Sequence, residues 1–268
     1  MADVKREAVY PFLIFKEAGR ICRQNLAKLS AIYLIFYIPY LFLSGLAIVL
    51  PGDQSNMLGI IATLLGLWSS VALLVAANKA VRGETFRIGE SAIGAKQYFL
   101  SYLGVNLLIP IFIIGVLFAW GSFALGNFIL VAKINVIAAF VLQIVFFVAA
   151  ICLLVYFMIR WALGGAACVL ENMRPVDALK RSRILIKDYV NPVVGEYFLF
   201  IMATLLAAIP YLVLVSILGN SKDGMEIEML IGAVNNIIIN SMLIPFMFII
   251  MVVLYKKLKE VNEANVRA

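Results

Sequence analysis

The segment ENMRPVDALKRSRILIKDYVNP, Glu171 to Pro192, separates two long apolar stretches of the chain. It mixes basic and aliphatic residues so that a helix would carry apolar side chains on one side and charged ones on the other. Such a helix lies at a membrane surface with its apolar side in the headgroup layer. The segment therefore predicts an amphipathic interfacial helix. Its basic residues are Lys180, Arg181, Arg183 and Lys187, and its apolar residues are Val176, Leu179, Ile184, Leu185 and Ile186.

The composition is that of an integral membrane protein. Of 268 residues, 64% are hydrophobic and 14% are charged, whereas about 25% are charged in soluble domains. A hydrocarbon core about 30 Å thick needs about 20 apolar residues per helical span, and six such stretches are present. We therefore expect one polytopic, all-α membrane domain over residues 1–268. The expected spans are about 29–50, 57–78, 98–120, 136–159, 193–218 and 229–255.

The N-terminal segment does not predict a cleaved signal peptide, and the cysteines predict neither a disulfide framework nor a metal site. The first 30 residues carry both charge signs and no small-residue cleavage site, so we expect the first span to be an uncleaved anchor. Cys22, Cys152 and Cys168 are odd in number and fall in cytoplasmic or intramembrane positions, which supports neither a disulfide framework nor a metal site. We expect these cysteines to pack as small apolar residues.

The basic residues are distributed unevenly between the two sides of the expected spans. Twenty of the 22 lie in the N-terminal segment, the connection between spans two and three, the region from Arg160 to Lys187, and the C-terminal tail. Lys133 and Lys222 are the other two. Since short cytoplasmic loops retain Lys and Arg, both termini are expected in the cytoplasm. The net charge of +7 is dispersed along these boundaries, which favours anionic membrane lipids over nucleic acid as the partner.

Three segments of the chain resemble one another. Each has an acidic residue, a small residue directly after it and a basic residue six positions after the acid, and an Ile-Pro pair follows inside the next span. This predicts three units, each an interfacial helix followed by a helical hairpin, so that interfacial helices precede spans 1, 3 and 5. Chance matching is the alternative, because Ile and Pro are ordinary in membrane helices. The segments are Glu17-Ala18 with Arg23, Glu90-Ser91 with Lys96, and Asp177-Ala178 with Arg183, and the Ile-Pro pairs begin at Ile38, Ile109 and Ile209.

The same 22-residue segment resembles a signature of a bacterial and archaeal family of six-span membrane proteins. This family is the membrane domain attached to some glycerophosphoryl diester phosphodiesterases, with its free-standing YciC-type relatives, in which an acidic residue, a short turn and a proline precede an Ala-Leu-Lys-x-Ser helix. The resemblance implies a six-span fold in the cytoplasmic (inner) membrane. It implies no activity, because the phosphodiesterase is a separate barrel with catalytic His and this chain has no His. The matching residues are Glu171, Pro175, Ala178, Leu179, Lys180 and Ser182.

Glu196 is an ionisable residue near the start of span five. Ionisable side chains inside a membrane are costly and are either paired or functional. We expect Glu196 to reach the interface or to pair with Arg160 or Arg183. A role in ion coupling or substrate binding is the alternative.

Span six contains an amide pair. Asn236 and Asn240 are four residues apart and share one helical face, so they can bond across to Gln143 or Asn106. Such amides hold neighbouring helices together. The alternative is a polar substrate path, which would require the amides to line a hydrated cavity.

Basic residues from all three repeated segments form a candidate phosphate or lipid-headgroup site, if the units converge on one cytoplasmic surface. Ordinary retention of positive charge explains the same residues. The sequence has no phosphate-binding loop, no His-based metal site and no nucleophile elbow, so we expect neither an enzyme nor a bound cofactor. The candidate residues are Arg20, Arg23, Lys96, Arg174, Lys180, Arg181, Arg183 and Lys187.

These observations favour a non-enzymatic function. The leading hypothesis is a lipid-associated scaffold, or an accessory subunit of a membrane complex, with a basic amphipathic collar on its cytoplasmic side. The rival is a transporter or permease for a small or lipidic substrate, built on kinked helices and the amide face of span six. A carrier needs a water-accessible cavity that reaches Asn236 or Asn240, whereas a scaffold is packed shut there.

Overall fold

The computed structural model describes residues 9–50, 52–218 and 224–266, and these ranges contain helices and no strands. Six helical stretches are long and apolar enough to cross a membrane, which confirms the expected all-α polytopic fold class. The helices are α2 (Pro11–Val49), α3 (Asp53–Val81), α4 (Ile88–Gly94), α5 (Lys96–Ala132), α6 (Val136–Trp161), α7 (Gly164–Leu170), α8 (Pro175–Ile186), α9 (Val190–Leu218) and α10 (Gly224–Val266).

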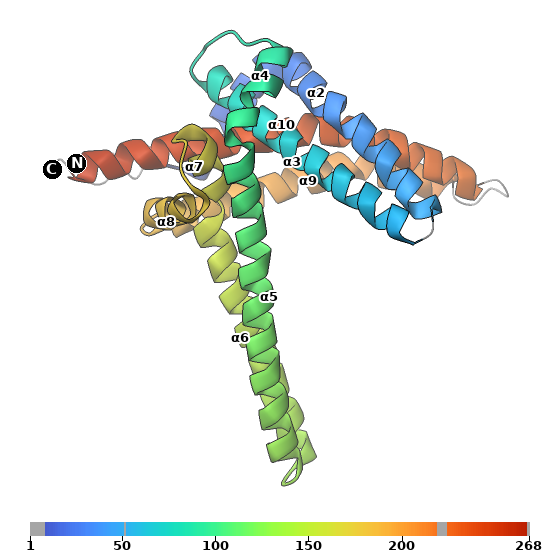
Figure 1. Ribbon diagram of the computed structural model, residues 1–268, viewed down its shortest axis with the longest axis vertical. Helices are drawn as coiled ribbons and strands as arrows, with labels where there is room; N and C mark the ends of the chain where they lie inside the picture. Colours follow the sequence, from blue (N-terminus) through green and yellow to red (C-terminus); the bar gives the residue numbers. More distant parts are fainter. Residues whose placement is uncertain (1–8, 51, 219–223, 267–268) are drawn as a thin grey trace.

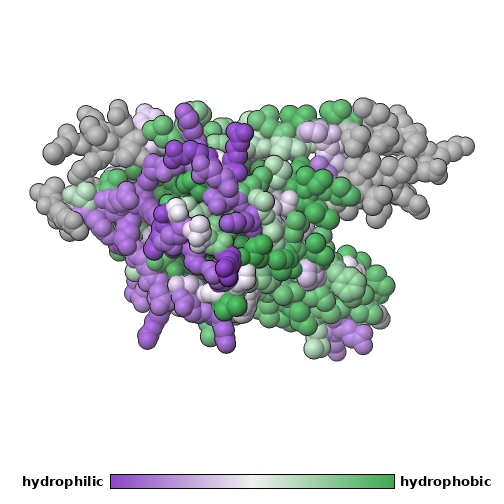
Figure 2. Space-filling view, turned by 90° about the horizontal axis from the view of Figure 1, so that it is seen from above, coloured by the Kyte–Doolittle hydropathy of each residue, from purple (hydrophilic) through white to green (hydrophobic). Residues whose placement is uncertain are grey.

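The long helices form two arms that leave a common end of the molecule. In Figure 1, α2, α3, α9 and α10 make up one arm, and the α5–α6 hairpin points in a different direction. The short helices α4, α7 and α8 gather where the arms meet. Figure 2, seen from above, shows hydrophilic side chains concentrated in one region of this face and hydrophobic side chains over much of the rest. The polar ends of the spans therefore meet on one side of the molecule.

The first arm is held together by small residues on α3. Ala72, Ala76 and Ala80 recur every four residues and are buried, so they lie on one face of the helix. Small side chains allow the backbones of membrane helices to approach closely. This close packing stabilises the helix contacts, because the hydrophobic effect does not drive association in lipid. Side chains of α2 and α10 then fill this core, including Leu29 and Ile249, which are fully buried.

The second arm is longer than the sequence predicted. Span three was expected to end near Trp120, but α5 continues to Ala132, so most of the expected linker is helical. The indole Nε1 of Trp120 donates a hydrogen bond of 2.8 Å to the carbonyl oxygen of Phe146 and ties α5 to α6. Asn135 caps α6, since its Oδ1 accepts from the backbone N–H groups of residues 137 and 138.

After α6 the chain bends and starts a new helix at a glycine pair. α6 ends at Trp161 and α7 begins at Gly164. A Cβ atom on Gly164 would lie 2.9 Å from a methyl carbon of Leu179, and one on Gly165 would lie 2.8 Å from the Tyr102 ring. Glycine therefore permits α7 to pack directly against α8 and α5.

The segments that were expected to form interfacial helices take three different forms. The first is not separate, because α2 runs without a break from Pro11 through the first span. The second is the short α4 ahead of α5, and the third is α8 ahead of α9. In all three, the small residue that follows the repeated acid is fully buried: Ala18, Ser91 and Ala178.

Candidate functional site: the basic surface around helix α8

Helix α8 packs one side against the protein and turns the other outward. Leu185 and Ile186 are fully buried, whereas Val176 and Ile184 are more than half exposed. The prediction that these apolar residues together face the headgroup layer is therefore wrong for Leu185 and Ile186, which belong to the core. The polar residue Ser182 is also fully buried.

Ser182 locks α8 onto the end of α6. Its hydroxyl donates a hydrogen bond of 2.9 Å to the carbonyl oxygen of Arg160 and accepts one of 3.2 Å from the backbone N–H of Leu163. The last carbonyls of a helix have no partner within it, so a side chain that reaches one of them stabilises the helix end. These two hydrogen bonds, which we call the Ser182 lock, hold the next residue, Arg183, close to the end of α6.

A hollow of about 510 Å³ lies between α6 and α8, and its lining contains four basic side chains and no acidic one. We call it the cationic hollow. The guanidinium carbon of Arg160 lies 5.2 Å from the centre of the Tyr156 ring, a cation–π contact. The Nε atom of Arg160 is buried and has no hydrogen-bond partner among the described residues. The lining residues are Tyr156, Arg160, Lys180, Arg183, Ile184 and Lys187.

Arg181 points into a different environment, a cluster around Glu171. The side chain of Glu171 is only 13% exposed, and its Oε1 lies 2.9 Å from the Nζ of Lys259 on α10. Arg181 pairs with the same carboxylate, with its Nε 3.3 Å from Oε2. We call these residues, with Tyr255, the Glu171 cluster; it ties the α7–α8 connection to α10.

The electrostatics of the Glu171 cluster favour the charged state. Burial acts to raise the pKa of Glu171, but Lys259, the Tyr255 hydroxyl and Arg181 outweigh it, so the pKa lies below its ordinary value. Burial acts to lower the pKa of Arg181, and the negative charge of Glu171 outweighs it and raises that pKa. The Tyr255 hydroxyl lies near the Glu171 carboxylate, but it makes no well-aligned hydrogen bond among the described residues. The charge of Arg181 is thus neutralised within the protein by Glu171, so this residue is not available to an external ligand.

The other predicted basic residues are exposed at several places on the polar end. Arg20 and Arg23 lie on α2 beside a separate shallow hollow. Lys96 is exposed at the start of α5, and Arg174 is exposed immediately before α8. The structure therefore brings three of the eight candidates together in the cationic hollow: Lys180, Arg183 and Lys187. It adds Arg160, whose position at the end of an apolar stretch was the available signal.

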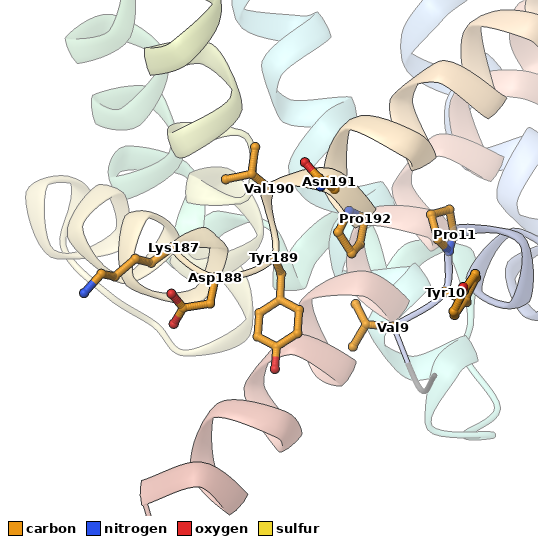
Figure 3. Close-up of a pocket in the computed structure, with 9 residues that line it drawn as sticks. All are labelled: Val9, Tyr10, Pro11, Lys187, Asp188, Tyr189, Val190, Asn191 and Pro192. Atoms are coloured by element: carbon orange, nitrogen blue, oxygen red, sulfur yellow. The ribbon is translucent and has the colours of Figure 1, made fainter. Parts of the chain in front are cut away.

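A second hollow, of about 580 Å³, lies between the start of α2 and the turn from α8 to α9 (Figure 3). Its lining includes Tyr10, Pro11, Asp188 and Tyr189. In Figure 3, the amino group of Lys187 extends away from Tyr10 and Pro11. Its polar side chains are one carboxylate, one ammonium group, one amide and two phenols, which form no catalytic constellation, so we assign no chemistry to this hollow.

Glu196 is the polar residue that departs most from its prediction. It is 1% exposed on α9, and neither of its carboxylate oxygens has a hydrogen-bond partner among the described residues. The expected ion pair with Arg160 or Arg183 is not formed. Glu196 instead borders a narrow gap together with apolar residues of α10, including Met251 and Leu254.

The amides of span six bond to each other rather than across the bundle. The Nδ2 of Asn240 donates a hydrogen bond of 2.9 Å to the Oδ1 of Asn236. Gln143 is exposed on α6, and the side chain of Asn106 donates to the carbonyl oxygen of Tyr102 one turn earlier. The predicted contacts of Asn236 and Asn240 with Gln143 or Asn106 are therefore wrong, because Asn236 and Asn240 bond to each other and Asn106 bonds to its own helix.

Comparisons with known proteins identify no relative: no protein-family model matches the chain, and no curated protein or solved structure is similar to it. Among the described residues, no group of three or more His, Cys, Asp or Glu side chains is placed to hold a metal ion.

Proposed function

We propose that this chain is a non-enzymatic membrane protein that binds anionic lipid at the polar end of its spans and acts there as a scaffold or as an accessory subunit of a membrane complex. One observation carries the proposal. One set of basic residues is neutralised by ion pairs between different elements, and a second set faces outward with no acidic partner among the described residues.

The inward set lies mainly on α10 and ties this helix to α2 and to the α7–α8 connection. Lys257 is paired with Glu17 of α2 at 2.7 Å. Lys259 is paired with Glu171 at 2.9 Å. These acids are therefore not available to neutralise the outward cations.

The outward set covers the ends of α2, α5 and α8. Each Lys or Arg near an anionic membrane surface contributes about 1 kcal/mol of attraction, so several together favour an anionic leaflet. The positive-inside rule would place this end, and with it both termini, in the cytoplasm. The resemblance of Glu171–Pro192 to the six-span family agrees with this topology. The outward residues are Arg20, Arg23, Lys96, Arg174, Lys180, Arg183 and Lys187.

Electron paramagnetic resonance of spin-labelled lipids around the reconstituted full chain tests the proposal. Phosphatidylglycerol should associate at least about twofold more strongly than phosphatidylcholine at 0.1 M NaCl, and this preference should fall at about 1 M, where the Debye length shrinks from about 10 Å to about 3 Å. Equal association of the two lipids at low salt would contradict the proposal.

The rival function, transport, is favoured by one observation: Glu196 is buried, and its carboxylate has no hydrogen-bond partner among the described residues. Membrane carriers place ionisable groups inside their spans. Asn240→Cys in a background without other cysteines distinguishes the two functions. A carrier requires a hydrated path to this position, so a water-soluble maleimide would label it in intact membranes. A scaffold requires no such path, and we expect no labelling.

A further inference from the structure

The geometry points to a defined binding site for the phosphate group of a lipid headgroup in the cationic hollow between α6 and α8. The site holds one phosphate group at defined residues, whereas the attraction described above involves the whole outward set of basic residues. The inference rests on the proposed function, since both require anionic lipid at this face. Its cationic residues are Arg160, Lys180, Arg183 and Lys187, and Tyr156 and Ile184 complete the lining.

The charge of the hollow calls for an anion from outside. Four basic side chains converge on it from two helices, and none of them forms an ion pair with a described residue. Like charges held together repel, and a bound anion relieves the repulsion. A phosphate group offers several oxygens at once, which suits the forked donors of Arg160 and Arg183 better than a single-point acceptor would.

The hollow is built rather than assembled from loose surface side chains. The Ser182 lock fixes α8 against α6 through two hydrogen bonds at a fully buried side chain. The Tyr156 ring supports the guanidinium of Arg160 at 5.2 Å. The buried Nε of Arg160 has no hydrogen-bond partner among the described residues. One of the four cations, Arg160, is thereby held by a neighbouring ring before any ligand arrives, and the Ser182 hydrogen bonds fix the backbone beside Arg183.

The position of the hollow favours a lipid over a free phosphate. It lies at the end of α6, within a stretch that is long and apolar enough to span a membrane. Large apolar side chains on the last turns of α6 are exposed, including Val155 and Met158, and Ile184 in the lining of the hollow is exposed as well. Acyl chains can lie along this surface while the phosphate occupies the hollow. Tyr156 is the residue type that membrane proteins place at the headgroup level.

The test compares two triple variants of the full chain in phosphatidylcholine nanodiscs into which phosphatidylglycerol is titrated. The site variant combines Lys180→Gln, Arg183→Gln and Lys187→Gln. The matched control combines Arg20→Gln, Arg23→Gln and Lys96→Gln, which removes the same charge from exposed positions outside the hollow. We expect the site variant to lower the apparent affinity for phosphatidylglycerol at least fivefold more than the control variant does. Circular dichroism melting verifies that both are folded.

The outcomes separate the site from the proposed function. If both variants lower the affinity equally, the site is overturned and the general attraction to anionic lipid stands. If neither does, both are overturned. If 10 mM inorganic phosphate displaces the lipid from the wild-type chain, the ligand is free phosphate and the lipid assignment is overturned.

A charge-conserving variant covers the case in which the triple site variant fails to fold. Arg160→Lys retains the positive charge but removes the planar fork and weakens the contact with Tyr156. We expect at least a threefold loss of affinity for phosphatidylglycerol. An unchanged affinity would overturn the site.

Discussion

Glu171, the first residue of the segment Glu171 to Pro192, stabilises the fold and does not belong to the cationic hollow. Its carboxylate is nearly enclosed and takes the charge of two basic residues, Arg181 and Lys259, that come from different parts of the chain. Removing one member of such a cluster leaves its partners without neutralisation, which costs more than a solvent-exposed ion pair is worth.

We predict that Glu171→Gln lowers the free energy of unfolding by about 1–3 kcal/mol at pH 7. Because the pKa of Glu171 is lower in the folded state than in the unfolded state, its contribution is fully present above the unfolded pKa and is lost as the pH falls through the folded value. Thermal unfolding in detergent between pH 7 and pH 3 measures both effects.

The matched control for Glu171 is Glu263→Gln. Glu263 approaches the same Lys259, but at 3.9 Å and with half of its side chain exposed, so we expect a change of less than about 0.5 kcal/mol. If Glu171→Gln retains the acid dependence of the wild-type chain, the assigned role of this carboxylate is wrong.

Gly104 is a second residue whose role is local packing. A Cβ atom at this position would lie 2.5 Å from the Cγ of Pro175, the first residue of α8. We predict that Gly104→Ala destabilises the protein by about 1–3 kcal/mol despite the better helix propensity of alanine. Gly115→Ala in the same helix meets no atom within 4 Å and is expected to be neutral or stabilising by up to about 1 kcal/mol. Thermal unfolding of both variants is the measurement, and equal effects would contradict the close contact.

At the scale of elements, the three repeated segments share a buried face. The residue after each acid is fully buried, and so is the small residue four positions further on in two of the three segments, Ala95 and Ser182; in the first segment, Cys22 is nearly so. A spacing of four places both small residues on one side of a helix. The repeat therefore records where each of these helices approaches its neighbours closely.

We predict that enlarging this face in the first segment destabilises the protein. Ala18→Leu adds volume at a position with no exposed surface and should cost about 1–3 kcal/mol. Ala27→Leu makes the same change at an exposed position of the same helix and should cost little. Unfolding free energies in detergent compare the two, and a neutral Ala18→Leu would refute the shared buried face.

The elements also show what the sequence was able to predict. Length and hydropathy identified the apolar stretches, because spanning a hydrocarbon layer requires them. The direction of each side chain was not predictable in the same way, since lipid and protein interior are both apolar environments. Leu185 and Ile186 are therefore indistinguishable in pattern from Ile184, although the first two are buried in protein and the third is exposed.

The contacts between elements that are far apart in the sequence could not be predicted from any local sequence pattern. Arg160 and Arg183 line one hollow only because Ser182 bonds to the end of α6. Glu171 meets Lys259 only because α10 returns to the polar end. These pairings depend on how the arms pack, whereas the basic character of the end was readable from the loops.

At the scale of the whole molecule, the helices are longer than the hydrocarbon layer. α5 has 37 residues and α10 has 43, so they are about 55 Å and 65 Å long, against a core of about 30 Å. Helices of this length tilt or project into the interface. Two arms that diverge from one end can each tilt to their own side of the bilayer normal, which keeps the polar end together on a single face.

This arrangement predicts the sides on which two exposed basic residues lie. Arg87 belongs to the polar end, and Lys133 is at the tip of the α5–α6 hairpin, one crossing away. In a background carrying Cys22→Ala, Cys152→Ala and Cys168→Ala, we expect a membrane-impermeant maleimide added to intact cells to label Lys133→Cys and not Arg87→Cys. In inverted membrane vesicles the pattern should reverse, because positive charge is retained in the cytoplasm. Labelling of both positions from one side would mean that α5 does not cross the bilayer, and the convergence of basic residues on one leaflet would then lose its physical basis.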